Sequence, residues 1–500
     1  MERIDSNVIV GINPNYCMRR DGGVGTLCEG GRVFEEIPHR EGFLTHIHLL
    51  TAILFACFDG RRTLREAAQQ ASERLGVPFD ACVDCASLYI NNSEVVSNRI
   101  GSATQTVPQY MLVPVRDGLT FRSYDPDVFT SEAYDFTPPE RLGVPVNLNV
   151  VLTTKCLTDC VYCYARRPIP NHPAFGYEAV LDLIEQAAEK GVAKVDINGG
   201  EVLLYPQWFD VVKALVAHGY SPLISTKIPI KEDVAEKIID LGIPRFQISM
   251  DTVDYEASSA LLRVQGNRYI RDMSNALGML SNAGVHVQIN SLITNKNSSI
   301  QSMDALVEFL SEHTCVKQIS FSPAGYSLYR KSFSAYAAAR SAIDTLSVHL
   351  NGEVKSRYPQ IRFTFSEGEH SLENRSSSRR FASRAFCTAN TRSAVVLPDG
   401  RVTICEELYD NPTFIIGDLK EKSLLEVWNS QKALDLFYLK RGNIPSDSPC
   451  RTCNDFDACR RERGVCWKTV LMAYGEDNCF FPDPLCPKAP KPINTYWHIN

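Results

Sequence analysis

An apolar strand runs directly into three closely spaced cysteines in one stretch of this chain: Val146-Asn-Leu-Asn-Val-Val-Leu-Thr-Thr-Lys-Cys156-Leu-Thr-Asp-Cys160-Val-Tyr-Cys163. Strand-like and amphipathic segments alternate from there as far as residue 322. The predicted strands cover residues 146–152, 194–198, 222–226, 245–250, 285–293 and 316–322, and the predicted helices between them include 178–190, 234–241 and 270–283. Six βα units in succession predict an α/β fold, a parallel sheet with right-handed crossovers in a partial (β/α)6 TIM-like barrel.

The composition is that of an ordinary globular protein. Hydrophobic residues make up 44% of the 500 residues and charged residues 22%, which excludes disordered, collagen-like and coiled-coil classes. The net charge of −6 gives no electrostatic reason to expect nucleic-acid binding. The longest apolar run, residues 49–58, is about half a membrane span, and the first residues lack the apolar core of a signal peptide. We therefore expect a cytoplasmic protein with no nucleic-acid or membrane partner.

The length favours several domains, since a domain usually has about 100–200 residues. We predict a winged-helix-like α+β domain at 1–100, a linker at 101–145, the barrel at 146–330, a connecting helical segment at 331–386 and a cysteine-rich domain at 387–490.

Local signals outline the first domain. They predict a hairpin at Asp21-Gly-Gly23, then helices at 46–58, at 64–75 with Thr63 as its cap and Glu66 completing a capping box, and at 79–91.

Cysteine is the informative residue type. The chain has 17, an odd number that argues against a disulfide framework in the absence of a secretion signal. Three thiolates on the loop Cys156–Cys163 can bind three irons of a [4Fe-4S] cluster and leave the fourth iron open, as a catalytic site requires. The alternative, a zinc knuckle, usually has four ligands, and the spacing of the nearby His172 is wrong for a fourth.

Thr153–Ala165, with Tyr162 before the third cysteine, resembles the signature of the radical S-adenosylmethionine (radical SAM) family. One βα unit later, Gly199-Gly200-Glu201 resembles the family's Gly-Gly-Glu motif, although Val202 stands where the family usually has proline. Glycines let the backbone approach a ligand, and the resemblance implies that Glu201 accepts hydrogen bonds from the ammonium group of SAM.

The resemblance extends to later strand ends. Ser249-Met-Asp251 is similar to the family's Ser-Leu-Asp, and Arg263 follows in Leu261-Leu-Arg-Val264. The resemblance assigns Asp251 to SAM binding and implies that Ser249 contacts the ribose or methionine part of SAM and Arg263 its carboxylate. Ser225 closes the third predicted strand and is assigned to the same site. After that strand, Lys227 stands where the family often has asparagine. The alternative for each of these residues is a strand-end cap or a surface ion pair. The implied chemistry needs one electron, from a donor such as flavodoxin or ferredoxin, to cleave SAM to a 5′-deoxyadenosyl radical.

Residues 387–486 resemble the SPASM domain, which holds two auxiliary iron–sulfur clusters in peptide-modifying radical SAM enzymes. The resemblance assigns one cluster to Cys450, Cys453, Cys459 and Cys486 (the Cys450 set), and the other to Cys387, Cys405 and Cys466 (the Cys387 set), with an open iron or Cys479 as fourth ligand. The chain would then hold three [4Fe-4S] clusters. The gap of six residues before Cys466 is longer than the usual three. Two structural zinc ions are the alternative.

Glu406 follows Cys405 at a position where some relatives have an acidic base. The alternatives for Glu406 are a catalytic base and a solvated carboxylate.

Residues 50–96 are similar to the recognition element of ribosomal peptide maturases, which resembles the pyrroloquinoline quinone peptide chaperone and binds a leader peptide as an added strand. The alternative is an ordinary winged-helix domain. Cys82 and Cys85, with Cys17 and Cys28, are either a zinc site or small buried residues.

Together these resemblances imply an enzyme that installs a thioether, carbon–carbon or carbon–oxygen crosslink in a ribosomally made precursor peptide. Two alternatives stay open at this point. One is a radical SAM maturase of an enzyme's catalytic residue, as in sulfatase maturation, and the other is a zinc-stabilised peptide-binding scaffold without catalytic activity.

Overall fold

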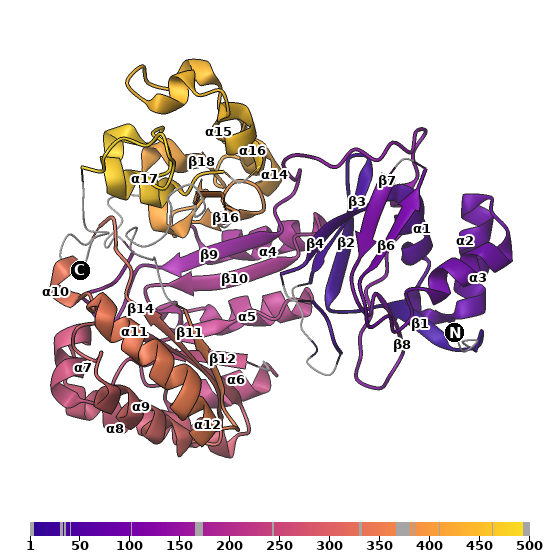
Figure 1. Cartoon of the computed structure of the whole chain (residues 1–500). Helices are drawn as coiled ribbons and strands as arrows, with labels where there is room; N and C mark the ends of the chain where they lie inside the picture. Colours follow the sequence, from indigo (N-terminus) through magenta and orange to yellow (C-terminus); the bar gives the residue numbers. More distant parts are fainter. Residues whose placement is uncertain are drawn as a thin grey trace. The chain divides into compact units, whose positions relative to one another are not determined.

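The computed structural model describes residues 5–30, 34, 37–40, 42–101, 103–165, 174–242, 245–329, 333–366, 381–382, 384, 386–409, 411–462 and 464–493 (Figure 1). His172 lies outside the described residues. The chain divides into two compact units. Unit 1 comprises Met1–Leu148, Asp182–Val195 and Leu215–Ser221, and unit 2 comprises Asn149–Leu181, Asp196–Ala214 and Pro222–Asn500.

Unit 1 contains three small antiparallel groups of strands. Their orders are β5 (Asp59–Thr63), β1 (Ile9–Ile12), β8 (Leu112–Pro114); then β2 (Tyr16–Asp21), β3 (Val24–Glu29), β4 (Leu44–His48); and β6 (Val96–Ile100) with β7 (Ala103–Val107). The predicted hairpin is confirmed, since Asp21 pairs with Val24 and Gly22 has a φ of 60° in the turn. Strands β7 and β8 lie in the segment 101–145 that was predicted to be a linker.

The helices of unit 1 correct two predicted boundaries. Helix α1 (Leu49–Ala56) begins three residues later than predicted, because Leu44–His48 pairs with β3 and the His48 ring accepts a hydrogen bond from the Leu50 amide. Helix α2 (Leu64–Leu75) has the predicted capping box of Thr63 and Glu66. Helix α3 (Phe79–Ser87) ends four residues earlier than predicted, before Asn91 takes a positive φ.

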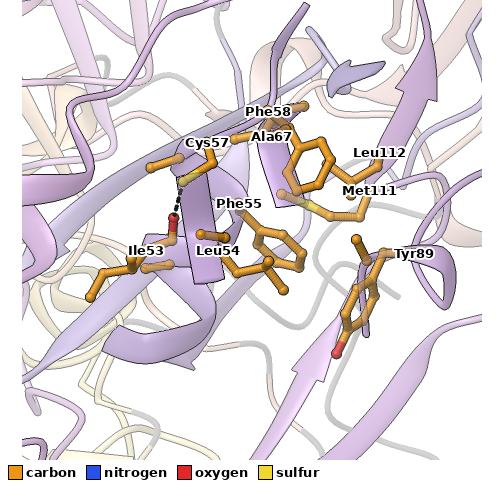
Figure 2. Close-up of a cluster of buried hydrophobic side chains, with 14 of the residues drawn as sticks. Ile53, Leu54, Phe55, Cys57, Phe58, Ala67, Tyr89, Met111 and Leu112 are labelled. Carbon is orange, nitrogen blue, oxygen red and sulfur yellow. Dashed lines mark hydrogen bonds between the residues drawn. The ribbon is translucent and has the colours of Figure 1, made fainter. Parts of the chain in front are cut away.

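The core of unit 1 surrounds the apolar helix α1. Phe55 of this helix meets the Tyr89 ring edge-on at a centroid distance of 5.0 Å, and Met111 and Leu112 pack in the same cluster (Figure 2). Nearly every side chain of α1 is buried, which explains why its sequence is apolar on all faces rather than amphipathic.

All six predicted strands of the barrel are present, in two hydrogen-bonded groups. β11 (Ile224–Thr226), β12 (Arg245–Ser249), β13 (His286–Ile293), β14 (Val316–Pro323) and β15 (Arg362–Phe365) form a parallel sheet in that order. The second sheet has the order β10 (Lys194–Gly199), β9 (Asn147–Thr153), β16 (Ser393–Val396), β17 (Arg401–Thr403), β18 (Ile415–Asp418). Strand β15 was not predicted, and β16 extends the sheet of β9 with strands from the cysteine-rich part.

Helices separate the strands of unit 2 along the chain and cover the barrel sheet in Figure 1. They are α4 (Tyr177–Glu189), α5 (Trp208–Ala217), α6 (Glu232–Asp240), α7 (Tyr255–Leu262), α8 (Gly266–Asn282), α9 (Ile300–Ser311), α10 (Phe333–Tyr336), α11 (Arg340–His349) and α12 (Lys355–Arg357). Short helices dominate the cysteine-rich part: α14 (Leu424–Trp428), α15 (Gln431–Phe437), α16 (Phe456–Glu462) and α17 (Trp467–Tyr474). None of the described helices combines the length and apolar character that crossing a lipid bilayer requires.

Candidate functional site

Cys156, Cys160 and Cys163 (the loop cysteines) lie on the loop that follows β9, at the carboxyl end of the strand. Thr158 Oγ1 lies 3.3 Å from the Sγ atoms of both Cys156 and Cys160, which brings these two sulfurs around one hydroxyl group. The end of α7 holds the loop from outside, because the amides of Asp159 and Val161 donate to the carbonyls of Leu262 and Leu261 at 3.1 and 3.0 Å. The loop therefore has a defined position beside the strand ends.

Gly199 and Gly200 let the end of β10 lie against the start of the cysteine loop. The Gly200 amide donates to the Thr153 carbonyl at 2.7 Å. A Cβ atom on Gly199 would lie 2.6 Å from that same carbonyl oxygen, and one on Gly200 would lie 2.6 Å from the Thr154 oxygen. Side chains at these two positions would push the strand away from the loop, so the glycines are required by close backbone packing.

Glu201 is buried and already hydrogen-bonded to the backbone. Its carboxylate accepts from the amides of Leu203 at 3.3 Å and Lys227 at 3.2 Å. Burial raises the pKa of this carboxyl, and the backbone hydrogen bonds oppose the rise. The structure thus fixes the Glu201 side chain at the end of β10, where the resemblance expected a SAM contact.

A buried charged group connects the loop to the barrel strands. Lys227 Nζ lies 3.0 Å from Asp251 Oδ2 and donates to the Tyr162 hydroxyl at 3.0 Å, and that hydroxyl donates in turn to Asp251. The other carboxylate oxygen of Asp251 accepts from the Leu292 amide at 2.9 Å. Because Tyr162 lies between two of the loop cysteines, this network connects their loop to β11, β12 and β13.

The remaining barrel residues take different positions. Ser249 Oγ accepts from Gln247 at 3.1 Å at the end of β12, and Ser225 lies half-buried in β11. Arg263 ends α7 in the left-handed conformation with φ of 57°. Its guanidinium pairs with Asp159 at 3.0 Å, and its side chain is 62% exposed. The structure therefore shows Arg263 in the surface ion pair that was its alternative assignment, with a partner inside the cysteine loop.

The donor set fits a cluster better than a single metal ion. Among the residues that the structure describes, no three His, Cys, Asp or Glu side chains converge closely enough to hold one ion. A [4Fe-4S] cluster asks for something different, since each thiolate binds a separate iron and the sulfurs surround the cluster from outside. Three cysteines on one short loop can supply these thiolates. Burial raises the pKa of Cys160, and the positive charge of Lys227 opposes that rise.

The C-terminal cysteines that raise one another's pKa belong to the same predicted set. Burial and then the Cys466 thiol raise the pKa of Cys387 to about 11, and burial, Cys466 and Cys387 contribute to the pKa of about 12 at Cys405. Cys450, Cys459 and Cys453 likewise raise the pKa of Cys486, after its burial. The charged neighbours of buried Cys479 are Arg460 and Asp477, not members of the Cys387 set.

Three cations donate to sulfurs of the Cys450 set. The donors are Arg384 Nη2 to Cys459 at 3.4 Å, Arg460 Nη2 to Cys450 at 3.6 Å and Lys488 Nζ to Cys453 at 3.3 Å. Hydrogen bonds from cations stabilise thiolates and anionic clusters alike. These basic residues were not singled out in the sequence, where they look like ordinary surface charges.

Glu406 extends from the Cys387 set to the barrel. Its Oε2 accepts from Asn149 Nδ2 of β9 and Asn198 Nδ2 of β10, both at 3.2 Å, and from the Tyr164 hydroxyl at 3.3 Å. Burial, and then the charge of Glu407, raise the pKa of the Glu406 carboxyl. Glu406 is therefore not a freely solvated carboxylate, because it is half-buried and hydrogen-bonded to side chains of β9 and β10.

Two family models match this chain. The radical SAM superfamily model matches residues 150–310, and the SPASM iron–sulfur cluster-binding domain model matches residues 387–454. Residues 150–310 form a radical SAM domain. The chain is therefore an enzyme, and its radical SAM and SPASM domains imply S-adenosylmethionine and [4Fe-4S] clusters as cofactors.

Similar proteins include enzymes with different substrates. The PqqA peptide cyclase of Streptomyces rochei is 22% identical over 358 residues, which cover 70% of this chain and 91% of that protein. The GTP 3′,8-cyclase of Nautilia profundicola is 26% identical over 170 residues, 32% of this chain, and the match spans about half (51%) of the cyclase.

The fold is shared with a solved structure over nearly the whole chain. SuiB of Streptococcus suis bound to S-adenosylmethionine aligns with a TM-score of 0.63 at 15% identity, covering 95% of this chain and 100% of SuiB. The structure of SuiB bound to its precursor peptide SuiA gives the same TM-score, 0.63, at 15% identity over 96% of this chain. The predicted α/β class, a partial barrel with a SPASM domain, is confirmed.

Several residues around the radical SAM domain were not foreseen as parts of the site. Asn149 and Asn198 are half-buried polar residues next to the buried Leu148, Val150 and Ile197, and this was the available signal, because an amide withdrawn from water needs a partner. Lys227 was noticed only as a departure from the family. Its partner Asp251 had been assigned to SAM binding.

The four N-terminal cysteines do not come together. Cys17 and Cys28 pack with Leu142, Val146 and Ala193, whereas Cys82 belongs to the hydrophobic core around α1 and Cys85 packs against that core. The proposed four-cysteine zinc site is therefore wrong, because β2 and β3 direct Cys17 and Cys28 to the face of their sheet opposite Tyr16, Met18 and Leu27 of that core.

Proposed function

We propose that this enzyme installs an intramolecular crosslink, a thioether or a carbon–carbon or carbon–oxygen bond, in a ribosomally made precursor peptide. The observation that carries the proposal is the position of Glu406. This carboxylate follows Cys405 of the Cys387 set directly and reaches Asn149 within β9 and Asn198 near the end of β10. A proton acceptor and the cysteines proposed for an auxiliary cluster would thus be neighbours in the chain, an arrangement that suits oxidative bond formation.

The cofactor assignments belong to this proposal. The loop cysteines would hold the cluster that binds SAM, with Tyr162, Gly199, Gly200, Glu201, Ser225, Ser249, Asp251 and Arg263 around it. The Cys387 and Cys450 sets would hold two more [4Fe-4S] clusters, giving three, with an open iron or Cys479 completing the Cys387 set. When bound, SAM and its cluster supply a 5′-deoxyadenosyl radical, which removes one hydrogen atom from the substrate.

Closing a crosslink removes two hydrogens from the peptide in total. One leaves as the hydrogen atom, and the second leaves as a proton and an electron. Glu406 is placed to accept the proton at its carboxylate, because three neutral donors hold Oε2 in a fixed orientation. The Cys387 set, one residue away, would hold the group that receives the electron. A donor such as flavodoxin or ferredoxin would supply the electron that starts the reaction.

Unit 1 is proposed to bind the leader of the precursor. The fold shared with SuiB, which was solved with its precursor peptide SuiA, covers 96% of this chain. Unit 1 also has the elements for peptide addition, since its short sheets end in edge strands beside helices α1–α3.

Candidate peptides encoded by short reading frames beside the gene test the proposal. The anaerobic holoenzyme is supplied with SAM, dithionite and each peptide, and products are examined by mass spectrometry. We expect 5′-deoxyadenosine and a product lighter than the peptide by two hydrogens. The leader test is made by shortening the peptide, since unit 1 includes barrel residues 182–195 and deleting part of it would disturb the barrel.

The variant Glu406→Gln, which keeps the size of the side chain, should lower crosslinking by about 100-fold or more while SAM cleavage continues. Full crosslinking by this variant would refute the role of Glu406. Conversion of a single serine or cysteine to an aldehyde, without a crosslink, would instead support the sulfatase-maturase alternative. Equal turnover of leaderless and full-length peptides would refute leader binding by unit 1.

A further inference from the structure

Cys17 and Cys28 form a buried thiol pair in unit 1 that the proposed function does not use. They lie directly opposite each other on β2 and β3, and their sulfurs are 4.0 Å apart. Directly paired residues of antiparallel strands have Cα atoms about 4.5–5.5 Å apart, which is within the range of about 4.4–6.8 Å that a disulfide spans. The two sulfurs can therefore be joined without separating the strands.

The surroundings of this pair favour a thiolate at Cys17. The Cys28 thiol donates to Cys17 Sγ, and Arg122 and Arg19 place positive charge nearby, so that the pKa of Cys17 falls to about 6 against the effect of burial. Arg19 is paired with Asp21 at 2.9 Å, whereas among the described residues no carboxylate pairs with the half-buried Arg122, and withdrawing an unpaired cation from water is unfavourable. The Cys17 thiolate is the anion that balances it.

A cavity large enough for a small oxidant lies against Cys17. A cavity of about 640 Å³ is lined by Cys17, Arg19, Arg122, Tyr124 and Tyr220, among other residues of unit 1. The volume far exceeds what a peroxide molecule needs, and the basic lining suits a reaction in which hydroxide leaves. Cys17 itself is only 1% exposed, so the side chains that line the cavity must shift before an oxidant contacts its sulfur.

We propose that Cys17 and Cys28 are a redox site in which Cys17 reacts with a hydroperoxide and Cys28 then closes a disulfide. In the first step the Cys17 thiolate attacks one peroxide oxygen, an S–O bond forms, the O–O bond breaks, and the leaving hydroxide takes a proton to become water. In the second step Cys28 loses its proton and attacks the Cys17 sulfur, and a second water leaves. The two thiols lose two electrons, and one hydrogen peroxide is reduced to two waters.

The structure also explains the order of the two steps. The hydrogen bond and negative charge of Cys17, together with burial, raise the pKa of Cys28 well above its usual value. Cys28 is thus a poor nucleophile while Cys17 is a thiolate. Once the sulfur of Cys17 is oxidised, its charge is gone and Cys28 is released to react.

Peptide mapping tests the proposal on the full-length holoenzyme. The anaerobic protein is treated with graded amounts of hydrogen peroxide, alkylated under denaturing conditions and digested with trypsin, which places Cys17 in peptide 4–19 and Cys28 in peptide 21–32. We expect these two peptides to become linked at least about tenfold faster than Cys57 is oxidised. Cys57 is the internal control. It is buried in the same unit and its pKa is raised to about 12, so it reacts slowly with the same peroxide, whatever amount the clusters consume.

Three variants complete the test. Cys28→Ser should abolish the linked peptides and accumulate a sulfenic acid at Cys17 that dimedone traps, and Arg122→Gln should slow the oxidation of Cys17. Cys57→Ser is the matched control and should leave the link unchanged. Oxidation of Cys17 no faster than that of Cys57 in the unaltered protein would overturn the proposal, whether or not the variants fold. A link that forms as fast in Arg122→Gln as in the unaltered protein would also overturn the proposal.

Discussion

Replacing Lys227 by methionine removes the cation from the buried network behind the loop cysteines. Asp251 would then keep its charge with its side chain only 2% exposed, while the Lys227 side chain in the native protein is 16% exposed. Removing one partner of a buried ion pair costs about 3–5 kcal/mol. The Tyr162 hydroxyl and the Leu292 amide still donate to Asp251, so we expect the lower end, about 3 kcal/mol.

Hydrogen exchange measures this loss of stability at individual strands. A local measurement is needed because a protein of two units does not unfold in a single transition. The amides of β12 and β13 should exchange about 100-fold faster in Lys227→Met, since about 1.4 kcal/mol corresponds to a factor of ten. The double variant Lys227→Met/Asp251→Asn should recover most of the protection, because no unpaired charge is left buried.

Lys190→Met is the matched control for this experiment. Lys190 pairs with Glu189 at the surface, with side chains 42% and 65% exposed. Such pairs contribute about 0–1 kcal/mol, so exchange should change by less than about fivefold. An equally small effect of Lys227→Met, or a double variant no better protected than the single one, would refute the assigned role of the network.

Alanine at all three loop cysteines should abolish 5′-deoxyadenosine formation while the iron bound at the two C-terminal sets remains, which iron analysis and chromatography of the SAM products will show. The change Arg460→Gln should lower the midpoint potential of the cluster at the Cys450 set by tens of millivolts, because a cation beside a cluster favours its reduced form. Arg451→Gln is the control in that spectroscopic titration, since Arg451 donates to the carbonyls of Arg441 and Ile444, and an equal shift would contradict the assignment. Thr63→Ala removes the capping box of α2 and should destabilise unit 1 by about 1 kcal/mol, and unchanged amide protection in α2 would contradict it.

The strands of the barrel could be predicted closely because their signal is local. Alternating apolar and polar residues identified β12 and β13 to within one residue. Strand β15 was missed, because Arg362–Phe365 is short and alternates only twice. Helix α1 was predicted to begin three residues early because an apolar run does not distinguish a strand that leads into a helix from the helix itself.

The site was predictable where its residues are close in sequence. Three cysteines within eight residues must share a loop, and two glycines after a strand must permit a close approach, so these groups can be read from the chain. The contacts of Glu406 with Asn149 and Asn198 cross 257 and 208 residues, and no spacing rule reaches that far.

The order of residues alone determined the βα alternation and the sulfur-rich loop, because these depend on neighbours along the chain. Only the tertiary structure decided that Lys227 neutralises Asp251, that a carboxylate beside Cys405 reaches the barrel strands, and that Cys17 faces Cys28 rather than Cys82. The physical reason is that a buried polar or charged group must find a partner, and the register and packing of distant strands determine which partner lies within reach.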